Sequence, residues 1–287
     1  MTDVFNLKDA SVKFTEFLKN QKRASATILA YGNDITQLTT FLNKKGVSVA
    51  SAVNSPLLEE FKADLEKKGY TAKSVSRKIN SLKTFFRFLK NEGAIDNDPA
   101  SSVSHPKYEV KPPRILSKLE YRALRDACRS DARVSAIVEL MLQTGVRIGE
   151  VANLSLEDNR GTGIFIKPFE SHQSRIIPLN KAAKEALGRY LTERPKAKEK
   201  AIFVTKTGHP FLIRNIRSSI ERYFEMAGIK DAKVNDLRHT WVFHHLAAGT
   251  PLVTISKLAG HKRLSTTEKY LKLITEKKES SVRLEEL

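Results

Sequence analysis

The first third of the chain carries apolar residues at the three- and four-residue spacing of amphipathic helices. In the third of these stretches, Ser55 and Pro56 form a cap followed by a proline at the first helical position, a typical helix start. The apolar pattern stops in a segment with three prolines, which bias the backbone toward extended structure. The pattern therefore predicts four helices, over about residues 7–18, 25–46, 55–69 and 71–91.

Beyond the prolines, helical stretches are mixed with short alternating ones. Ser117 with Glu120 three residues later matches a capping box, and Gly145 ends an apolar helix. Helices are also predicted over about 213–226, 235–249 and 252–259 and from 265, and strands over 163–167, 175–179 and 201–204. We therefore expect a mainly α protein with a small antiparallel β-sheet. The pattern predicts a helical domain over 1–104, a linker over 105–114 and a mixed domain over 115–287.

The charge of the chain indicates what kind of partner it binds. Its 287 residues contain 50 Lys and Arg against 32 Asp and Glu, a formal charge of +18. Such a field favours a polyanion, either nucleic acid or, as the weaker alternative, an anionic membrane surface. The fourth helix has basic residues without an acidic one among them, which indicates phosphate contact rather than an ordinary solvated face. These candidate DNA-binding residues are Lys73, Arg77, Lys78, Lys83 and Arg87.

Other features narrow the class of protein. The single Cys128 excludes an intrachain disulfide and a cysteine-rich zinc site, and its helical spacing from Leu124 predicts a buried thiol. No apolar run approaches 18 residues, and the N-terminus lacks the apolar segment of a secretory signal. We expect a cytoplasmic protein, associated with the nucleoid in a prokaryotic host, with no membrane partner.

Three short motifs follow one another in the C-terminal two thirds. They are Thr-Gly-Val-Arg-Ile-Gly-Glu over 144–150, Leu-Arg-His-Thr over 237–240, and a Gly-His pair at 260–261 followed by Tyr270. Taken singly, each has an ordinary structural explanation, such as an Arg–Glu surface pair, a helix-terminal histidine or a half-buried tyrosine. In this order on a basic chain, they indicate a tyrosine that attacks a DNA phosphodiester.

At these residues the chain resembles the tyrosine recombinase, or phage integrase, family of lambda-integrase-like enzymes, with the layout of its Xer-type members. The resemblance implies an N-terminal four-helix SAM-like core-binding domain and an α+β catalytic domain. It implies site-specific cleavage and rejoining of DNA through a 3′-phosphotyrosyl intermediate and a Holliday junction, without metal or cofactor. The implied partners are double-stranded DNA with an inverted-repeat site and further copies of the chain, a dimer on each site and a tetramer in the synapse.

The resemblance also assigns roles to residues. Arg147 and Arg238 would hold the nonbridging phosphate oxygens in planar contacts that lysine does not reproduce. His261 would donate a hydrogen bond to the phosphate, and Lys167 would protonate the leaving 5′ oxygen. Tyr270 would be the nucleophile. Glu150, three residues after Arg147, is placed to hold that guanidinium by an ion pair.

Two positions depart from the family pattern. Asn235 stands where the family has the first His of His-x-x-Arg, and an amide binds phosphate but does not move a proton near neutral pH. His239 is a candidate partial substitute. Lys167 lies further ahead of the second strand than the usual hairpin lysine, so either the hairpin turn is longer or the lysine role is misplaced or weakened.

Two other functions remain open from sequence. One is a DNA-binding paralogue that occupies such sites without cutting, which Asn235 and the displaced Lys167 support. The other is a type IB-like enzyme that relaxes supercoils as a monomer. Substitution of Tyr270 by Phe separates binding from cleavage, and the topology of the products separates recombination from relaxation. Residues 271–287 are either a segment that docks into a neighbouring protomer or a frayed tail.

Overall fold

The computed structural model describes residues 6–168 and 173–279, with the side chains of 276–279 left aside. The chain divides into two compact units, Met1–Val110 and Lys111–Leu287. Helices dominate both, and the described residues contain one sheet of two strands. The expectation of a mainly α protein with a small antiparallel sheet is thus confirmed. Within the described ranges, no helix combines the length and the apolar character that a membrane span requires.

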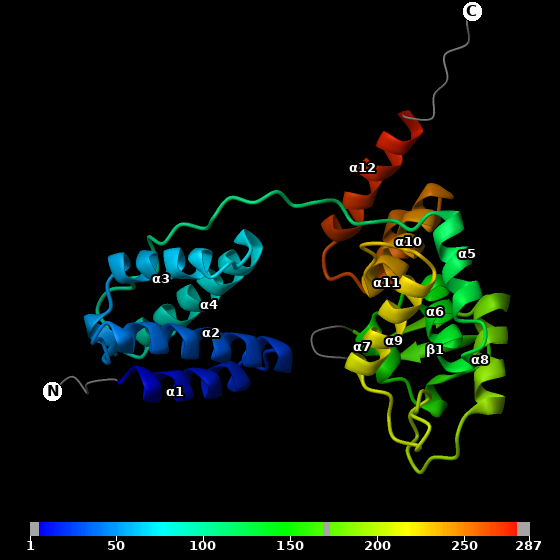
Figure 1. Ribbon diagram of the computed structural model, residues 1–287, viewed down its shortest axis with the longest axis horizontal. Helices are drawn as coiled ribbons and strands as arrows, with labels where there is room; N and C mark the ends of the chain where they lie inside the picture. The colour runs from blue at the N-terminus through cyan, green and yellow to red at the C-terminus, as the bar shows by residue number, and fades with distance from the viewer. Residues whose placement is uncertain (1–5, 169–172, 280–287) are drawn as a thin grey trace, which may run out of the picture. The chain divides into compact units, whose positions relative to one another are not determined.

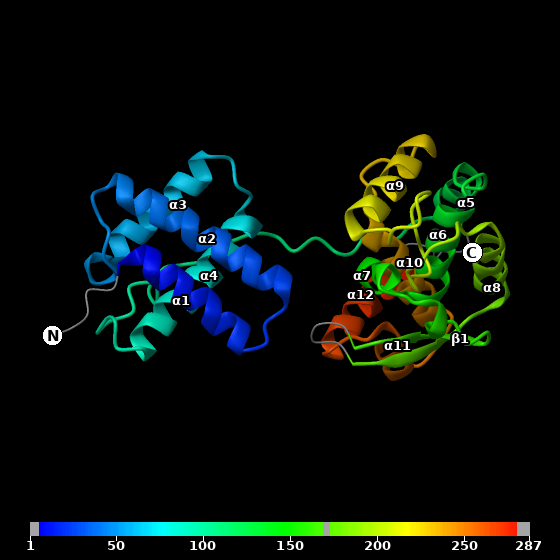
Figure 2. The same cartoon turned by 90° about the horizontal axis from the view of Figure 1, so that it is seen from below.

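The first unit is built from four helices around one apolar core, and the views in Figures 1 and 2 show them as a single bundle. Aromatic rings occupy its centre, where Phe14 packs edge-on against Phe85 with ring centroids 5.2 Å apart. The helices are α1 (Leu7–Asn20), α2 (Ser25–Lys44), α3 (Ser55–Lys67) and α4 (Ala72–Asn91), with a short 3-10 turn η1 (Ala50–Ala52) before α3.

The predicted cap of α3 was wrong by one residue. The cap is Asn54, whose side-chain oxygen accepts a hydrogen bond from the backbone N–H of Leu57 at 3.0 Å. Ser55 is the first helical residue, and its hydroxyl donates instead to the carbonyl oxygen of Pro99 at 2.8 Å. Both residue types cap helices well, so local sequence alone did not separate them.

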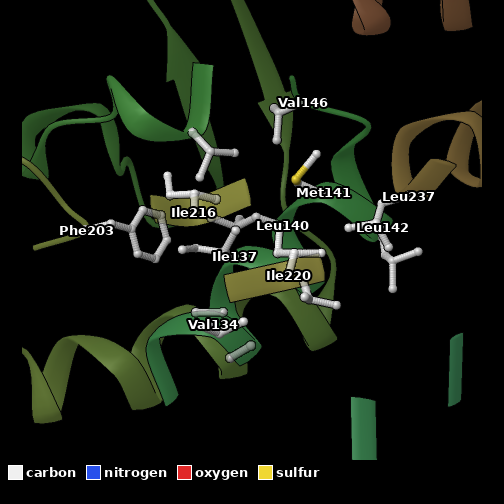
Figure 3. Packing of buried hydrophobic residues seen from close by; sticks show 14 of the residues in the cluster. Val134, Ile137, Leu140, Met141, Leu142, Val146, Phe203, Ile216, Ile220 and Leu237 are labelled. Carbon is white, nitrogen blue, oxygen red and sulfur yellow. The ribbon is translucent and has the colours of Figure 1, made fainter. Parts of the chain in front are cut away.

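The second unit is organised around α6, which is buried on nearly all sides. Figure 3 shows Val134, Ile137, Leu140 and Met141 of this helix among side chains from other elements. The elements are α5 (Lys118–Ala127), α6 (Ala132–Thr144), α7 (Ile148–Ala152), η2 (Leu156–Asp158), β1 (Gly163–Ile166), β2 (Arg175–Pro178), α8 (Lys181–Glu193), α9 (Ile213–Met226), α10 (Val234–Ala247), α11 (Leu252–Ala259) and α12 (Ser265–Glu279).

The sheet is smaller than the sequence suggests. Strands β1 and β2 pair antiparallel, with Ile166 opposite Arg175. The third strand predicted over 201–204 is not formed. Ala201 and Val204 make only isolated bridges, and each to a different segment, so no continuous ladder develops.

A separate apolar cluster joins the last three helices. Trp241 and Phe243 of α10 pack with Ile255 of α11 and with Tyr270 of α12. Helix α12, predicted to begin at 265, is 15 residues long. The cluster fixes the tyrosine against α10 rather than leaving it on an isolated turn. Residues 280–287, the end of the predicted tail, lie outside the described part of the chain.

Candidate active site

Arg147 lies at the N-cap of α7, two residues after Gly145 ends α6 in a left-handed conformation with φ 64°. A Cβ at Gly145 would lie 2.2 Å from the ring of Trp241, so this position needs glycine on both grounds. The ion pair expected from spacing is present, with Arg147 Nη1 at 3.0 Å from Glu150 Oε1. The backbone N–H of Arg147 also donates to Glu150 Oε2 at 2.8 Å. Glu150 therefore holds both the backbone and the guanidinium of Arg147.

Arg238 projects from α10 into the interior, where only 3% of the residue is exposed. Its guanidinium donates to the carbonyl oxygens of Gly145 and, at 2.7 Å, Ala259. Burial, with the nearby charge of Arg147, lowers the pKa of Arg238 to about 9. The side chain therefore remains cationic at neutral pH, because the carbonyls replace the water that it has lost.

Three guanidiniums meet at the C-terminal end of α11. Arg175 Nε lies 2.6 Å from the first of the three successive carbonyl oxygens 258–260, and Arg238 binds the second. Arg147 donates to the second at 3.2 Å and to the third at 2.7 Å. These carbonyls have no partner inside a helix and lie at the negative end of its dipole. The end of α11 thus gathers three cations that would otherwise repel one another.

Arg175 is the member of this group that our sequence analysis missed as a functional residue. Its Nη1 and Nη2 atoms each lie 2.8 Å from one carboxylate oxygen of Glu150, a parallel two-bond contact. A Cβ on Gly260 would meet the Arg175 guanidinium at 2.8 Å, so the glycine leaves room for it. The sequence showed only an arginine at the start of a predicted strand, and an arginine in such a position usually lies on the surface.

Glu150 is the counter-charge of the cluster. Burial acts to raise the pKa of its carboxyl group, but the hydrogen bond and charge of Arg175, followed by contacts from Arg147, hold it below its usual value of 4.5. Glu150 is therefore ionised, and one negative charge faces three positive ones. The remaining positive field suits an anionic phosphate.

His261 follows Gly260 at the end of α11. Its Nδ1 lies 2.7 Å from the hydroxyl of Thr267, which is fully buried in the first turn of α12. Burial, together with the charges of Arg238 and Arg147, lowers the pKa of His261 to about 3. The imidazole is therefore neutral and keeps one N–H to donate.

Tyr270 contacts the residue that follows Arg238. Its Oη lies 2.6 Å from Nδ1 of His239, and the two ring centroids are 5.9 Å apart. Tyr270 is 4% exposed, and this burial raises the pKa of its phenol to about 12. The structure thus places Tyr270 beside the arginine cluster through α10 and in contact with His239.

Two predicted site residues lie apart from these contacts. Lys167 follows β1, half exposed, with Nζ 3.2 Å from Asp158 and 2.9 Å from the hydroxyl of Ser155. Ile166 pairs with Arg175, so Lys167 directly follows the last paired residue of β1, and residues 169–172, where a longer turn would fall, lie outside the described part. Asn235 is exposed in the first turn of α10, one turn before Arg238.

A pocket of about 640 Å³ opens beside this cluster. Its lining includes Arg175 and His261, together with Lys257 and Lys262. The pocket therefore offers cationic and hydrogen-bonding groups next to the end of α11. Among the described residues, no group of three or more His, Cys, Asp or Glu side chains is arranged to hold a metal ion.

The basic helix of the first unit differs from our expectation. The buried carboxylate of Asp34, from α2, lies 2.5 Å from Arg77 and 2.8 Å from Lys78. Lys78 is itself buried, with 7% exposed, so an internal anion rather than a polyanion neutralises it. Lys83 is half-buried and donates to a backbone carbonyl. The remaining predicted contacts, Lys73 and Arg87, are exposed.

The buried thiol expected of Cys128 is present. The residue is 1% exposed, and burial raises its thiol pKa to about 11. The thiol is therefore protonated at neutral pH, and its role is packing in the core of the second unit.

A helical first unit, followed by a mixed unit that gathers two motif arginines, a histidine and a late tyrosine, defines the architecture of a tyrosine recombinase. Residues 114–277 match the phage integrase family, and residues 12–93 match the phage integrase N-terminal SAM-like domain. The chain belongs to the phage integrase family and is a tyrosine site-specific recombinase.

Individual relatives support this family assignment. Tyrosine recombinase XerC of Thermodesulfovibrio yellowstonii is 32% identical over 273 residues, which cover 90% of this chain and 89% of the relative. XerC of Oceanobacillus iheyensis is 31% identical over 271 residues, with 90% and 89% covered. The crystal structure of XerA recombinase is similar at a TM-score of 0.54 with 26% identity, covering 97% of this chain and all of the other. A lambda integrase tetramer bound to a Holliday junction shares the fold at a TM-score of 0.75 and 18% identity, over 90% of this chain and 78% of the other.

Proposed function

We propose that this recombinase cleaves DNA with Tyr270 and exchanges strands through a 3′-phosphotyrosyl link and a Holliday junction. The observation that carries the proposal is the meeting of Arg147, Arg238 and His261 at the end of α11, with Tyr270 on the next helix. The link conserves the energy of the phosphodiester, so a 5′ hydroxyl of another strand rejoins it without a cofactor.

The arginines supply the electrostatic part of the reaction. The attack of a phenol on a phosphodiester places extra negative charge on the nonbridging oxygens. Arg147 and Arg238 are already fixed by carbonyl contacts, so they stabilise that charge without reorganising, and the neutral His261 adds a donor. Arg175 holds Glu150 and thereby Arg147, which makes it a positioning residue.

Lys167 is the proposed acid for the leaving 5′ oxygen. Its ammonium group is bound to Asp158 and Ser155, so it must exchange these contacts for DNA. The lysine side chain is half exposed but Asp158 is buried, so DNA must replace a contact with a desolvated carboxylate. Asn235, at the exposed start of α10, is proposed to bind phosphate through its amide rather than to transfer a proton.

The first unit is proposed as the core-binding domain, over 1–104, joined by the linker 105–114 to the catalytic domain over 115–287. Exposed Lys73 and Arg87, with Arg77 and Lys83 beside them, are its proposed phosphate contacts. Lys78 is left out of this set because it is buried against Asp34. The chain is proposed to bind an inverted-repeat site as a dimer, to form a tetramer in the synapse, and to work in the cytoplasm on nucleoid DNA.

Covalent trapping tests the proposal. The protein is incubated with nicked duplexes that carry randomised inverted arms and is then denatured in detergent, and the DNA that stays linked to protein is sequenced. We expect defined arm sequences in the adduct, no adduct from Tyr270→Phe, and normal adduct from Tyr121→Phe as the matched control. Sequence-selective retention without any adduct would instead identify a non-cutting binder. Relaxed plasmids without exchanged products would identify a relaxing enzyme.

A further inference from the structure

Tyr270 must lose a proton before or as it attacks phosphorus. With its pKa raised to about 12, the phenolate form is only about one part in 10⁵ at pH 7. A nucleophile of this kind needs a base within hydrogen-bonding distance. Asn235, which stands at the usual position of the box histidine, has an amide that does not accept a proton near neutral pH.

The contact between Tyr270 and His239 has the geometry of such a base. Oη and Nδ1 lie 2.6 Å apart, and in the tautomer of His239 that carries its proton on Nε2 the phenol donates to the unprotonated Nδ1. Among the described residues, His239 is the side chain recorded in hydrogen-bonding contact with this oxygen. His261 is committed elsewhere, with Nδ1 against Thr267.

We propose that His239 is a catalytic residue that accepts the phenolic proton of Tyr270 and so supplies the base that Asn235 does not. The inference rests on the proposed function of Tyr270. His239 follows Arg238 directly on α10, so one helix carries both the base and the phosphate-binding arginine, and Tyr270 of α12 contacts this helix through His239.

The Oη–P bond forms and the P–O5′ bond breaks, while the Tyr270 proton passes to Nδ1 of His239. The leaving 5′ oxygen takes a separate proton, from Lys167 in the proposed function. In rejoining, the incoming 5′ hydroxyl forms the P–O5′ bond and gives its proton back to the Lys167 amine, while the Oη–P bond breaks and the His239 imidazolium returns its proton to the departing phenolate.

The protonation state of His239 fits this role. Burial lowers the pKa of His239 from 6.5, Asp236 opposes the shift, and Arg238 adds to it. Besides these two neighbours on α10, it faces Tyr270 of α12, and His261 is close enough for their charges to interact. The base is therefore in its proton-accepting form at neutral pH.

Single-turnover cleavage of the nicked duplex recovered by covalent trapping tests the inference. We expect His239→Ala and His239→Asn to form adduct about 10²- to 10⁴-fold more slowly, and His245→Ala, on the same helix, to be unaffected. The asparagine variant is decisive because its amide oxygen accepts a hydrogen bond but not a proton. Recovery of the rate in His239→Asn would reduce His239 to a positioning residue and overturn the inference. Faster adduct formation in His239→Ala would also overturn it, because the contact with His239 would then hold Tyr270 in an unreactive position.

A second substrate separates base from acid. A duplex with sulfur in place of the bridging 5′ oxygen has a leaving group that needs no proton. On it we expect the His239 variants to stay slow and Lys167→Ala to recover. Recovery of the His239 variants would assign His239 to the leaving group and overturn the inference.

The pH profile adds a readout independent of positioning. Adduct formation by the unmodified chain should fall as the pH drops through the lowered pKa of His239, below 6.5, and His239→Ala should lack this decline. The pKa of Arg238, about 9, lies above that window, and loss of the decline in His239→Ala distinguishes His239 from His261. Melting curves and DNA retention establish folding of each variant. Absence of adduct from the unmodified chain would overturn the proposed function itself, whereas equal adduct from the unmodified chain and His239→Ala would overturn the inference alone.

Discussion

Arg175 and Glu150 meet in two parallel hydrogen bonds of 2.8 Å, although 25 residues separate them in the chain. The same carboxylate binds Arg147 at 3.0 Å. A strand residue that is absent from the three recombinase motifs therefore fixes the orientation of a motif arginine.

Arg175→Lys should slow cleavage while leaving DNA retention nearly unchanged. Lysine keeps the charge but loses the planar pair of bonds and the bond to Leu258, so Glu150 and Arg147 shift. We expect a decrease of about 10- to 100-fold in single-turnover adduct formation, typical of small displacements in a site. Arg160→Lys, an exposed arginine stacked on Phe165, is the control. An unchanged rate in Arg175→Lys would show that the contact does not position Arg147.

Gly145→Ala should destabilise the second unit by about 2–4 kcal/mol, because left-handed strain is added to overpacking against Trp241. Gly228→Ala has similar strain, at φ 68°, but open space around its Cβ, so about 1 kcal/mol is expected there. Urea unfolding followed by fluorescence of Trp241, the single tryptophan, measures both. Equal losses of unfolding free energy in the two variants would mean that the Trp241 indole shifts to make room for the added methyl group.

Asp34→Asn should destabilise the first unit by about 3 kcal/mol, because Lys78 is left buried without its anion. Burial acts to raise the pKa of Asp34, but hydrogen bonds from Arg77 and Lys78 hold it below 3.8. The folded pKa is depressed, so the carboxylate's contribution is complete above the unfolded pKa and is lost as pH falls through the folded value. Thermal unfolding by circular dichroism should show the difference at pH 7 and its decrease below pH 3.8.

The matched variant for that experiment is Asp64→Asn. Asp64 pairs with Lys68 across one helical turn at the surface, where an ion pair contributes about 0.3–0.5 kcal/mol. A loss in Asp34→Asn no larger than this would contradict a structural role for the buried carboxylate.

Arg87→Ala should weaken DNA binding, whereas Lys78→Gln should change stability instead. Arg87 is exposed on α4, and each lost phosphate contact lowers the salt dependence of log K by about one unit. Lys78 is buried against Asp34 and makes no such contact in the proposal. Retention assays across a salt series separate the two, with Lys68→Ala as a surface control. A reduced slope for Lys78→Gln would return that residue to the interface.

Asn235→His should partly restore cleavage in a chain that carries His239→Ala. An imidazole in the first turn of α10 provides a titratable group at the position where an amide now stands. We expect a gain of about 10-fold in adduct formation over His239→Ala alone, within the range of general base catalysis. If the double variant is no faster, position 235 in this chain does not reach the reacting phenol.

Local signals in the sequence were sufficient for much of the fold. The capping box of Ser117 and Glu120 and the helix end at Gly145 are present as predicted, because each depends on residues a few positions apart. The strand predicted over 201–204 failed because a β-ladder needs a partner segment, and Ala201 and Val204 find different ones.

The candidate site likewise contains some contacts that local sequence predicts and others that it does not. The pair of Arg147 with Glu150 follows from helical spacing, but the contacts of Arg175 and of Asp34 join elements far apart in the chain. The sequence correctly showed basic residues on α4 without an acidic one among them. The carboxylate that pairs with two of them, Asp34, lies on a different helix, α2. Pairings of this kind depend on packing rather than on local pattern.

The carbonyls at the end of α11 are a common support for the cations of the site. Arg147, Arg175 and Arg238 come from three different elements, yet all rest on 258–260. Unwinding the last turn of this eight-residue helix would remove acceptors from all three cations at once and leave them with their contacts to Glu150 and Gly145. The geometry of all three arginines therefore depends on one turn of one short helix.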